Sequence, residues 1–227
     1  ARHPRSIVVV NAGAGVDLTP WIGRLGAVVY AWYPGDVGNL ALAEILFGKT
    51  NPSGKLPTTL PRKLEGTYYA RAYPPKDNKI VYEEGLLMGY RWFDANGVRP
   101  LFSFGHGLSY TTFEIGAVRV QPGRGASAMR LSASVRNTGG TTGAEVVQFY
   151  AGLPASPLQK AKRQLAGYTK VSLKPGEAKT VSVEVPWHAI ASFDLADKKW
   201  KVEPGNWTVW AGNASDNLTS TASIKLA

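Results

Sequence analysis

The first third of the chain alternates two apolar runs with two stretches of helical periodicity. The runs Ser6–Asn11 and Ala27–Trp32 are continuous and apolar, which is typical of strands buried on both faces of a parallel sheet. A short helix capped by Asp17 is predicted around Leu18–Leu25, and a second helix is predicted over Asn39–Phe47, where apolar residues recur at helical spacing. Two strands that are each followed by a helix predict a parallel sheet.

This predicted sheet has few strands. A parallel sheet needs cover on both faces and usually has about four or more strands, whereas this stretch offers two clear ones. We therefore expect the first part of the molecule to complete its sheet with strands from elsewhere. They would come from an upstream part of the same protein or from a partner chain.

The middle of the chain, residues 49–112, is punctuated by turn residues. The segment Tyr82–Phe93 is apolar and aromatic, but its interior glycines argue against a regular helix and indicate tight backbone packing. The stretch Thr67–Tyr73 is predicted to be a loop, although it carries three tyrosines and an arginine.

From about residue 113 the pattern changes to short strands separated by turn sequences such as Lys174–Glu177. The predicted strands are Arg130–Asn137, Glu145–Tyr150, Gln164–Leu173, Thr180–Val185, Trp207–Ala211 and, as a last edge, Ala222–Leu226. This spacing predicts an antiparallel β-sandwich of the immunoglobulin or fibronectin type III kind. The expected fold class is therefore α/β plus all-β, a partial α/β sandwich followed by a β-sandwich.

Composition adds mainly exclusions. The absence of cysteine from the 227 residues excludes disulfides, thiolate metal sites and a cysteine nucleophile. No apolar run approaches the ~18 residues of a membrane span, so we expect no membrane partner. The net charge of +10 first suggests nucleic acid, but the surplus lies in short clusters such as Lys160–Arg163 and Lys198–Lys201. We interpret these clusters as a solvated basic surface and expect no nucleic-acid partner.

Two further features bear on the cellular setting. N-glycosylation sequons begin at Asn206, Asn213 and Asn217, and they matter only in a host that glycosylates. The lack of cysteine does not fix the compartment. Of the alternatives, we favour a periplasmic or secreted location over a cytoplasmic one.

Taken alone, the residues offer no complete catalytic set. Gly48-Lys49-Thr50 lacks the upstream glycine of a phosphate loop, and no His/Asp/Glu cluster has metal-ligand spacing, so we predict no cofactor and no metal. Glu83 and Glu84 could act as general acid and base. Adjacent residues on an extended segment point to opposite faces, however, and a structural role as hydrogen-bond acceptors is favoured. His106 is expected to make a fixed hydrogen bond rather than to catalyse.

Four long motifs, in order along the chain, carry a resemblance to a known family. They are AWYPG at Ala31–Gly35, LAEILFGKTNPSGKLP at Leu42–Pro57, YEEGLLMGYRWFD at Tyr82–Asp94 and PLFSFGHGLSYTTF at Pro100–Phe113. They resemble the C-terminal part of glycoside hydrolase family 3, the β-glucosidase and β-xylosidase family. Residues 135–150, 165–185 and 201–215 are similar to that family's fibronectin type III-like domain.

The resemblance implies an arrangement of domains and a reaction. Residues 1–112 would be the C-terminal part of an α/β sandwich with a parallel sheet, and residues 113–227 a fibronectin type III-like β-sandwich. The family's retaining β-glycosidases, most often β-glucosidases, hydrolyse terminal non-reducing β-linked sugars of oligosaccharides or glycosides. They use an Asp nucleophile and a Glu acid/base whose carboxyl groups lie about 5–5.5 Å apart.

Neither of these two carboxylates maps onto this chain. The nucleophile belongs to an upstream (β/α)8 barrel, and the Glu comes from sandwich sequence upstream of the strand that Ser6–Asn11 matches. We therefore assign no catalytic residue and expect this chain alone to be inactive. The implied partners are the barrel, a β-glucoside or oligosaccharide substrate and a second subunit in a homodimer. The alternative is a non-catalytic carbohydrate-binding or structural module.

The loop after the second predicted strand departs from the family pattern. Where the family commonly has Gln-Glu-Gly-Gly, this chain has Asp36-Val37-Gly38-Asn39. The change alters either the rim of the substrate site or the capping of the next helix, and capping is the favoured interpretation. Because aromatic faces stack on sugars, this loop and the tyrosine-rich segment supply candidate substrate-binding residues, with simple packing as the favoured alternative. The candidates are Trp32, Tyr33, Asp36, Tyr68 and Tyr69.

Overall fold

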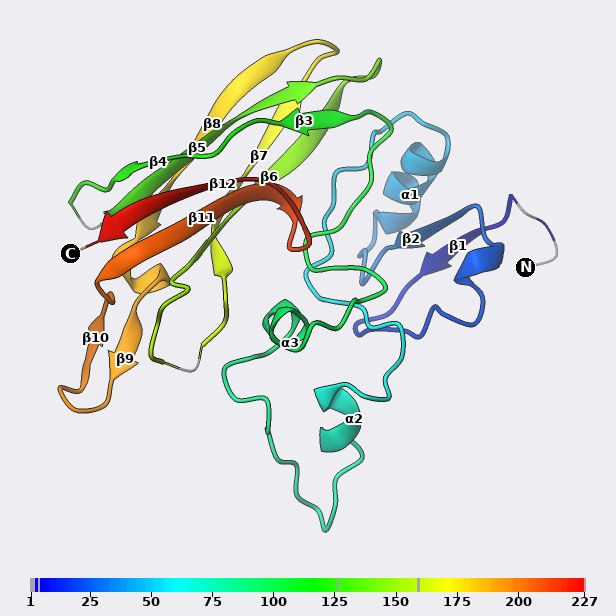
Figure 1. The fold of residues 1–227 in the computed structure, drawn as a ribbon. Helices are drawn as coiled ribbons and strands as arrows, with labels where there is room; N and C mark the ends of the chain where they lie inside the picture. Colours follow the sequence, from blue (N-terminus) through cyan, green and yellow to red (C-terminus); the bar gives the residue numbers. More distant parts are fainter. Residues whose placement is uncertain (1–2, 4, 126, 159, 227) are drawn as a thin grey trace.

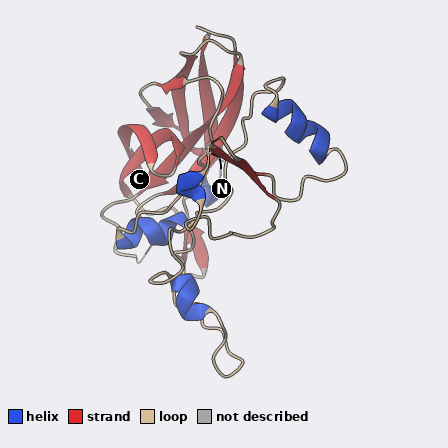
Figure 2. Ribbon diagram, turned by 90° about the vertical axis from the view of Figure 1, so that its right-hand side faces the viewer, coloured by secondary structure: helices blue, strands red, loops and turns tan. Residues whose placement is uncertain are grey.

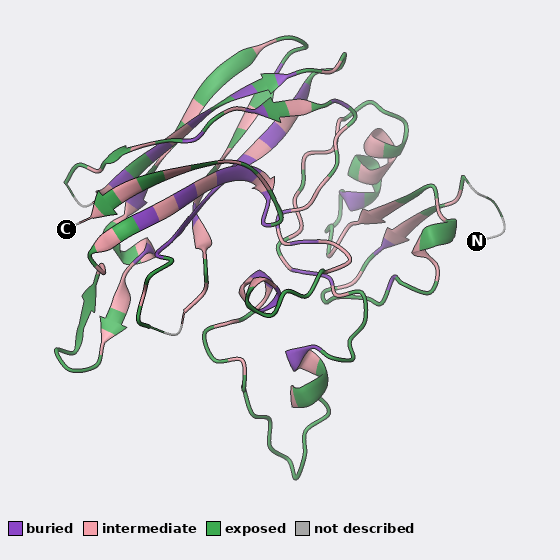
Figure 3. Cartoon of the chain, viewed as in Figure 1, coloured by how far each residue is buried: buried purple, intermediate pink, exposed green. Residues whose placement is uncertain are grey.

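Two short strands, β1 (Ile7–Val10) and β2 (Ala27–Tyr30), open the fold and pair in parallel (Figure 1). The structure is a computed structural model and describes residues 3, 5–125, 127–158 and 160–226. The parallel pairing confirms the two strands expected from the apolar runs. Both strands are mostly half-buried rather than buried on both faces (Figure 3). Within the described ranges no further strand pairs with either of them, so the outer edges of the pair have no strand partner there.

The connections in this part contain less helix than expected. The predicted helix over Leu18–Leu25 is wrong, because this stretch holds only a single 3₁₀ turn, η1 (Ile22–Arg24). The Asp17 carboxylate instead accepts a hydrogen bond from the Thr19 N–H at 2.9 Å, a local turn that competes with helix formation. The second predicted helix is confirmed as α1 (Gly38–Leu46).

Two short helices, α2 (Tyr68–Ala72) and α3 (Tyr90–Asn96), lie in the turn-rich middle of the chain. The prediction of a loop over residues 67–73 is therefore wrong. Within residues 82–93 the helix begins only after Gly89, whose φ is 61°. No atom lies within 4 Å of the position a Cβ would take at Gly89, so this glycine serves a left-handed backbone rather than tight packing. The segment between α2 and α3 projects from the body of the molecule (Figure 2).

The rest of the chain forms the expected antiparallel sandwich. One sheet has the order β12-β11-β6-β7; in the other, β5 pairs β8 along one edge and β3 and β4 along its opposite edge. The bounds are β3 Phe113–Ile115, β4 Arg119–Pro122, β5 Ser127–Asn137, β6 Gly143–Gly152, β7 Gln164–Leu173, β8 Ala178–Pro186, β11 Gly205–Ala214 and β12 Asn217–Leu226. A turn, η2 (Trp187–Ala189), leads to a hairpin of β9 (Ser192–Asp194) and β10 (Lys199–Lys201).

The main core lies between these two sheets. Every second residue of β5, from Met129 to Val135, is buried, as an inward face of period two requires. Phe149 of β6 and Trp207 of β11 face this row in the same apolar cluster. The alternation is visible along β11 in Figure 3. The prediction of a β-sandwich thus rests on the same alternation that builds the core.

The basic clusters are only partly solvated. Lys160 pairs with Glu203, and the Arg163 Nη2 lies 2.9 Å from the Asp94 Oδ1; the four side chains are between 16% and 23% exposed. The expectation of a simply solvated surface is therefore wrong for these two cations. Lys198 and its neighbour on the β9–β10 hairpin are exposed, as predicted. In the described part of the chain no helix is long and apolar enough to span a membrane.

Candidate functional site

The loops that follow β1 and β2 meet at the carboxyl edge of the parallel pair. The Tyr30 hydroxyl donates a hydrogen bond to the Ala14 carbonyl, and burial raises the pKa of that hydroxyl. The Trp32 ring centroid lies 4.4 Å from that of Tyr30. Trp32 has a φ of 52°, an uncommon left-handed conformation for a residue with a side chain. Such strain clusters at functional sites, and the carboxyl edge of parallel strands is where α/β proteins bind ligands.

Tyr33 lies against the backbone of the first of these loops. A Cβ on Gly13 would fall 2.3 Å from the Tyr33 Oη, so the ring packs directly against Gly13 and would have to move to accommodate a larger residue. The ring nevertheless remains 82% exposed. Tyr33 is thus presented at the edge of the sheet with most of its surface available for stacking, and its role as a rim residue stays a prediction.

Asp36 is exposed in the turn before α1. The N-cap position of α1 is Val37, and no side chain hydrogen-bonds the first turn of the helix. The favoured interpretation of this turn, helix capping, is therefore wrong. Gly38 is instead needed for close approach, because a Cβ there would lie 2.3 Å from the Pro34 Cβ. A role for Asp36 at the rim stays a prediction.

Tyr68 and Tyr69 lie on α2 in an aromatic cluster with α3. Their ring centroids are 4.0 Å apart, and the Tyr68 ring lies 5.5 Å from that of Trp92. Tyr68 is 6% exposed, and its hydroxyl accepts a hydrogen bond from the Gly89 N–H at 2.9 Å. Burial raises the pKa of the half-buried Tyr69, and the hydrogen bond to Tyr68 raises it further. In this chain Tyr68 thus packs α2 onto α3.

The five candidates fall into two groups. Trp32, Tyr33 and Asp36 follow β2, whereas Tyr68 and Tyr69 lie on α2, and no hydrogen bond or ring contact joins the two groups within the described residues. Figure 1 shows α2 apart from β2. The structure therefore gives one exposed edge and one packed aromatic cluster rather than a single constellation.

The remaining residues of chemical interest have structural surroundings. The His106 ring stacks on Phe102 at 5.0 Å, and its fixed hydrogen bonds are those of the main chain, with Ser103 and Leu56. Burial, and next the Lys55 ammonium, lower the pKa of the His106 side chain. Neither Glu83 nor Glu84 accepts a side-chain hydrogen bond from any described residue, so their expected acceptor role is not found. Within the described ranges, no three His, Asp or Glu side chains lie close enough to hold a metal ion.

Sequence reasoning missed the seam between the two parts of the molecule. The Lys55 Nζ lies 2.7 Å from the Glu145 Oε1, and the two side chains are 12% and 7% exposed. The Asn213 Nδ2 donates to the other carboxylate oxygen at 3.1 Å. The Gln148 Nε2 donates to the carbonyls of Gly105 and Asn213. The available signal was polar Glu145 and Gln148 within the otherwise apolar run EVVQFY.

A second set of contacts ties α3 to the sandwich. The Tyr90 hydroxyl accepts a hydrogen bond from the Leu165 N–H at 2.8 Å, and its ring meets that of Tyr150 edge-on. Arg163 donates both to Asp94 and to the Ser215 carbonyl. Burial raises the pKa of Asp94 against the opposing effect of the Arg163 charge. The two parts are therefore joined by specific polar contacts.

Comparison with known proteins gives this architecture a family. Residues 1–110 match the model described as the glycosyl hydrolase family 3 C-terminal domain, and residues 145–215 match the fibronectin type III-like domain. The chain belongs to glycoside hydrolase family 3. The resemblance carried by the four sequence motifs is confirmed.

Relatives in this family include solved and curated enzymes. DesR, a β-glucosidase from Streptomyces venezuelae solved with D-glucose, superposes with a TM-score of 0.91 at 42% identity, covering 99% of this chain and 29% of its own. Thermostable beta-glucosidase B of Acetivibrio thermocellus is 37% identical over 97% of this chain and 29% of its own length. An exo-alpha-(1->6)-L-arabinopyranosidase of Bifidobacterium breve is 33% identical over 100% of this chain and 30% of its length. The chain thus spans less than a third of these family 3 enzymes.

Proposed function

We propose that this chain is the C-terminal portion of a retaining β-glycosidase, a β-glucosidase, that hydrolyses terminal non-reducing β-linked sugars. The observation that carries the proposal is similarity to β-glucosidases over nearly the whole chain, together with a parallel pair of strands that are mostly half-buried and find no further strand partner among the described residues. Such a sheet calls for packing from further polypeptide, because parallel sheets are covered on both faces. The proposed cover is the rest of the α/β sandwich, beside the catalytic barrel.

The proposed division of labour follows from the residues. The Asp nucleophile and the Glu acid/base of the family belong to upstream sequence, so this chain supplies no reacting carboxylate. It would supply the wall of the site at the carboxyl edge of β1 and β2, where Tyr33 and Asp36 are exposed. The boundary between the two domains is proposed at residues 112 and 113, where β3 begins.

The experiment compares two proteins in a chromogenic β-glucoside assay: this chain alone, and this chain joined to the upstream barrel-containing segment. We expect no hydrolysis by the chain alone, and hydrolysis with retention of anomeric configuration by the joined protein. Activity of the chain alone would overturn the assignment of both carboxylates to upstream sequence. An inactive joined protein that binds sugars would favour the non-catalytic module.

A further inference from the structure

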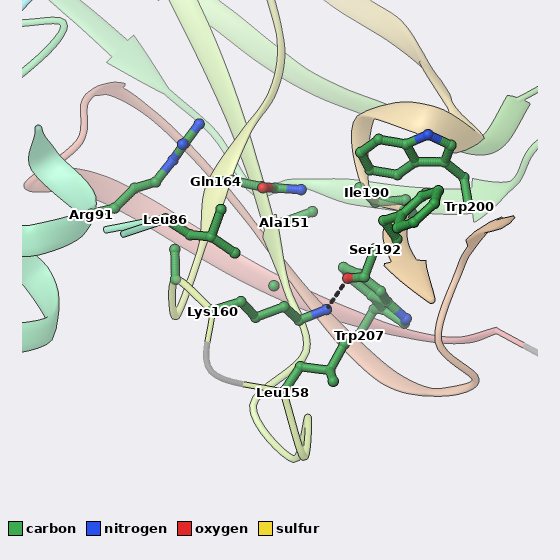
Figure 4. Close-up of a pocket in the computed structure, with 14 residues that line it drawn as sticks. Leu86, Arg91, Ala151, Leu158, Lys160, Gln164, Ile190, Ser192, Trp200 and Trp207 are labelled. Atoms are coloured by element: carbon green, nitrogen blue, oxygen red, sulfur yellow. Dashed lines mark hydrogen bonds between the residues drawn. The ribbon is translucent and has the colours of Figure 1, made fainter. Parts of the chain in front are cut away.

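A pocket of about 420 Å³ opens between the start of α3, the β6 and β7 strands and the β9–β10 hairpin (Figure 4). This volume lies in the range of about 300–1,000 Å³ that small-molecule sites occupy. The side chains that the argument uses are Arg91, Lys160, Ser192, Phe193, Trp200 and Trp207. The pocket joins residues of both parts of the molecule.

One wall of the pocket is aromatic. Trp200 is 57% exposed, and its ring meets that of Phe193 at 5.6 Å and 71°. Trp207 is buried beneath them, held by a hydrogen bond from its Nε1 to the Glu203 carbonyl at 3.0 Å. The C–H hydrogens of a pyranose ring carry partial positive charge, and they are attracted to the negative face of an aromatic ring. Exposed aromatic rings inside a concavity are therefore a platform for a sugar.

The charges of the pocket have one sign. Its described lining holds two cations, Arg91 and Lys160, and no carboxylate. Lys160 is neutralised by Glu203 and lies over the Trp207 ring at 5.0 Å. Arg91, in contrast, forms no ion pair with any described residue, and its guanidinium carbon lies 5.7 Å from the centroid of the Tyr90 ring. Figure 4 shows Arg91 and Trp200 on opposite sides of the pocket.

An arginine in this state points to an anionic ligand. A guanidinium that lines a pocket without a carboxylate partner keeps donors for a ligand, and a planar carboxylate satisfies it with two parallel hydrogen bonds. A ligand that reaches from Arg91 to Trp200 needs a carboxylate at one end and an apolar ring face at the other. Ser192, whose hydroxyl lies 3.5 Å from the Lys160 Nζ, offers a further polar contact between them.

We propose that this pocket binds an acidic carbohydrate, a disaccharide unit whose uronic acid carboxylate pairs with Arg91 and whose neighbouring sugar ring stacks on Trp200. The inference goes beyond glycoside hydrolysis, because it uses no catalytic group and none of the five candidate substrate-binding residues.

The test is calorimetric titration of the chain, at low salt, with glucuronic acid β-linked to glucose and with cellobiose, a neutral disaccharide of the same size. We expect the acidic disaccharide to bind at least about tenfold more tightly, because its carboxylate adds a charge-assisted bidentate contact to Arg91. Equal affinity for the two sugars, or binding of neither, would overturn the proposal.

Variants locate the binding. Arg91→Gln should lower the affinity for the acidic disaccharide to that for cellobiose, whereas Trp200→Ala should weaken both about fivefold. Arg99→Gln is the matched control, because Arg99 is exposed, lies outside the pocket and loses the same charge. If Arg99→Gln weakens binding as much as Arg91→Gln does, the attraction is general and the pocket is not the site. Trp200 lies on an exposed hairpin, so its replacement tests the proposal even if Arg91→Gln fails to fold.

Discussion

Lys55 and Glu145 form a nearly buried ion pair, 2.7 Å between Nζ and Oε1, that links the α/β part to the β-sandwich. Both charges have further partners: Lys55 donates to the Gly107 carbonyl at 3.2 Å, and Glu145 accepts from Asn213. A buried pair adds little net stability over an apolar one, but removing one partner leaves the other charge desolvated and alone. The ion pair therefore favours the one docking arrangement of the two parts in which both charges are paired.

Lys55→Met should lower the free energy of unfolding by about 3 kcal/mol, because it strands the buried Glu145 carboxylate. Urea denaturation followed by circular dichroism measures the change. Lys49→Met is the control, since Lys49 pairs with Glu44 but is 74% exposed, and its loss should cost less than about 1 kcal/mol. An equal decrease in the free energy of unfolding in the two variants would show that the buried pair contributes no more than an exposed one.

Tyr90→Phe should destabilise the chain by about 1–3 kcal/mol, because it leaves the N–H of Leu165 at the seam without its acceptor. Tyr168→Phe, which removes the hydroxyl of an exposed tyrosine on β7, should leave the thermal midpoint unchanged. A neutral Tyr90→Phe would mean that water replaces the hydroxyl.

Gly13→Ala should displace the Tyr33 ring, since the added methyl would meet it at 2.3–2.6 Å. The expected cost is about 1 kcal/mol, and it should vanish when Tyr33 is already alanine, giving a coupling of about the same size in a double-mutant cycle. Additive effects of the two changes would contradict the contact.

Because of His106, the chain should become less stable as the pH is lowered below neutral. Burial lowers the pKa of His106 in the folded chain, whereas the unfolded chain binds its proton at the ordinary value of 6.5. Below that value the unfolded state binds more protons, so the free energy of unfolding falls as pH is lowered through about 6.5. His106→Gln should flatten this part of the profile, and the exposed His188→Gln should not. A profile as steep in His106→Gln as in the parent would reject the assignment.

Tyr33→Ala in the joined protein should lower kcat/KM on a β-glucoside about fivefold, through KM, if the exposed ring stacks on substrate. Tyr168→Ala, which removes another exposed tyrosine, on the sandwich, should not change kcat/KM. An unchanged KM in Tyr33→Ala would leave Tyr33 as a packing residue against Gly13.

The strands were predictable because their signals are local. Apolar runs and alternation mark β1, β2, β5, β6, β7, β8, β11 and β12, and along β5 they select the buried residues. The strands β3, β4, β9 and β10, of three or four residues each, were not predicted, because they are too short to show a pattern. The helix α2 was missed because its five residues carry no periodic signal, and its contacts come from Trp92 and Gly89 on a later segment. Tertiary packing here overrides local propensity.

The seam and the pocket could not be predicted for a related reason. Lys55 reaches Glu145, and Arg91 and Trp200 come to line the same pocket, only after two separately patterned parts have docked. Charge counts place cations in the second half of the chain, but they do not reveal that Arg163 is paired and Arg91 is not. The family motifs, in contrast, could be recognised from the sequence because they are long and follow the family's order along the chain.

The polar seam also governs how this fold can be recombined. If the sandwich of one relative is grafted onto the α/β part of another, every donor that loses its acceptor at the seam becomes a buried unsatisfied group. A graft must therefore keep both members of each seam pair: Lys55 with Glu145, Tyr90 with the strand that holds Leu165, and Asp94 with Arg163. The two parts are separate in architecture, yet the residues of the seam must be exchanged together.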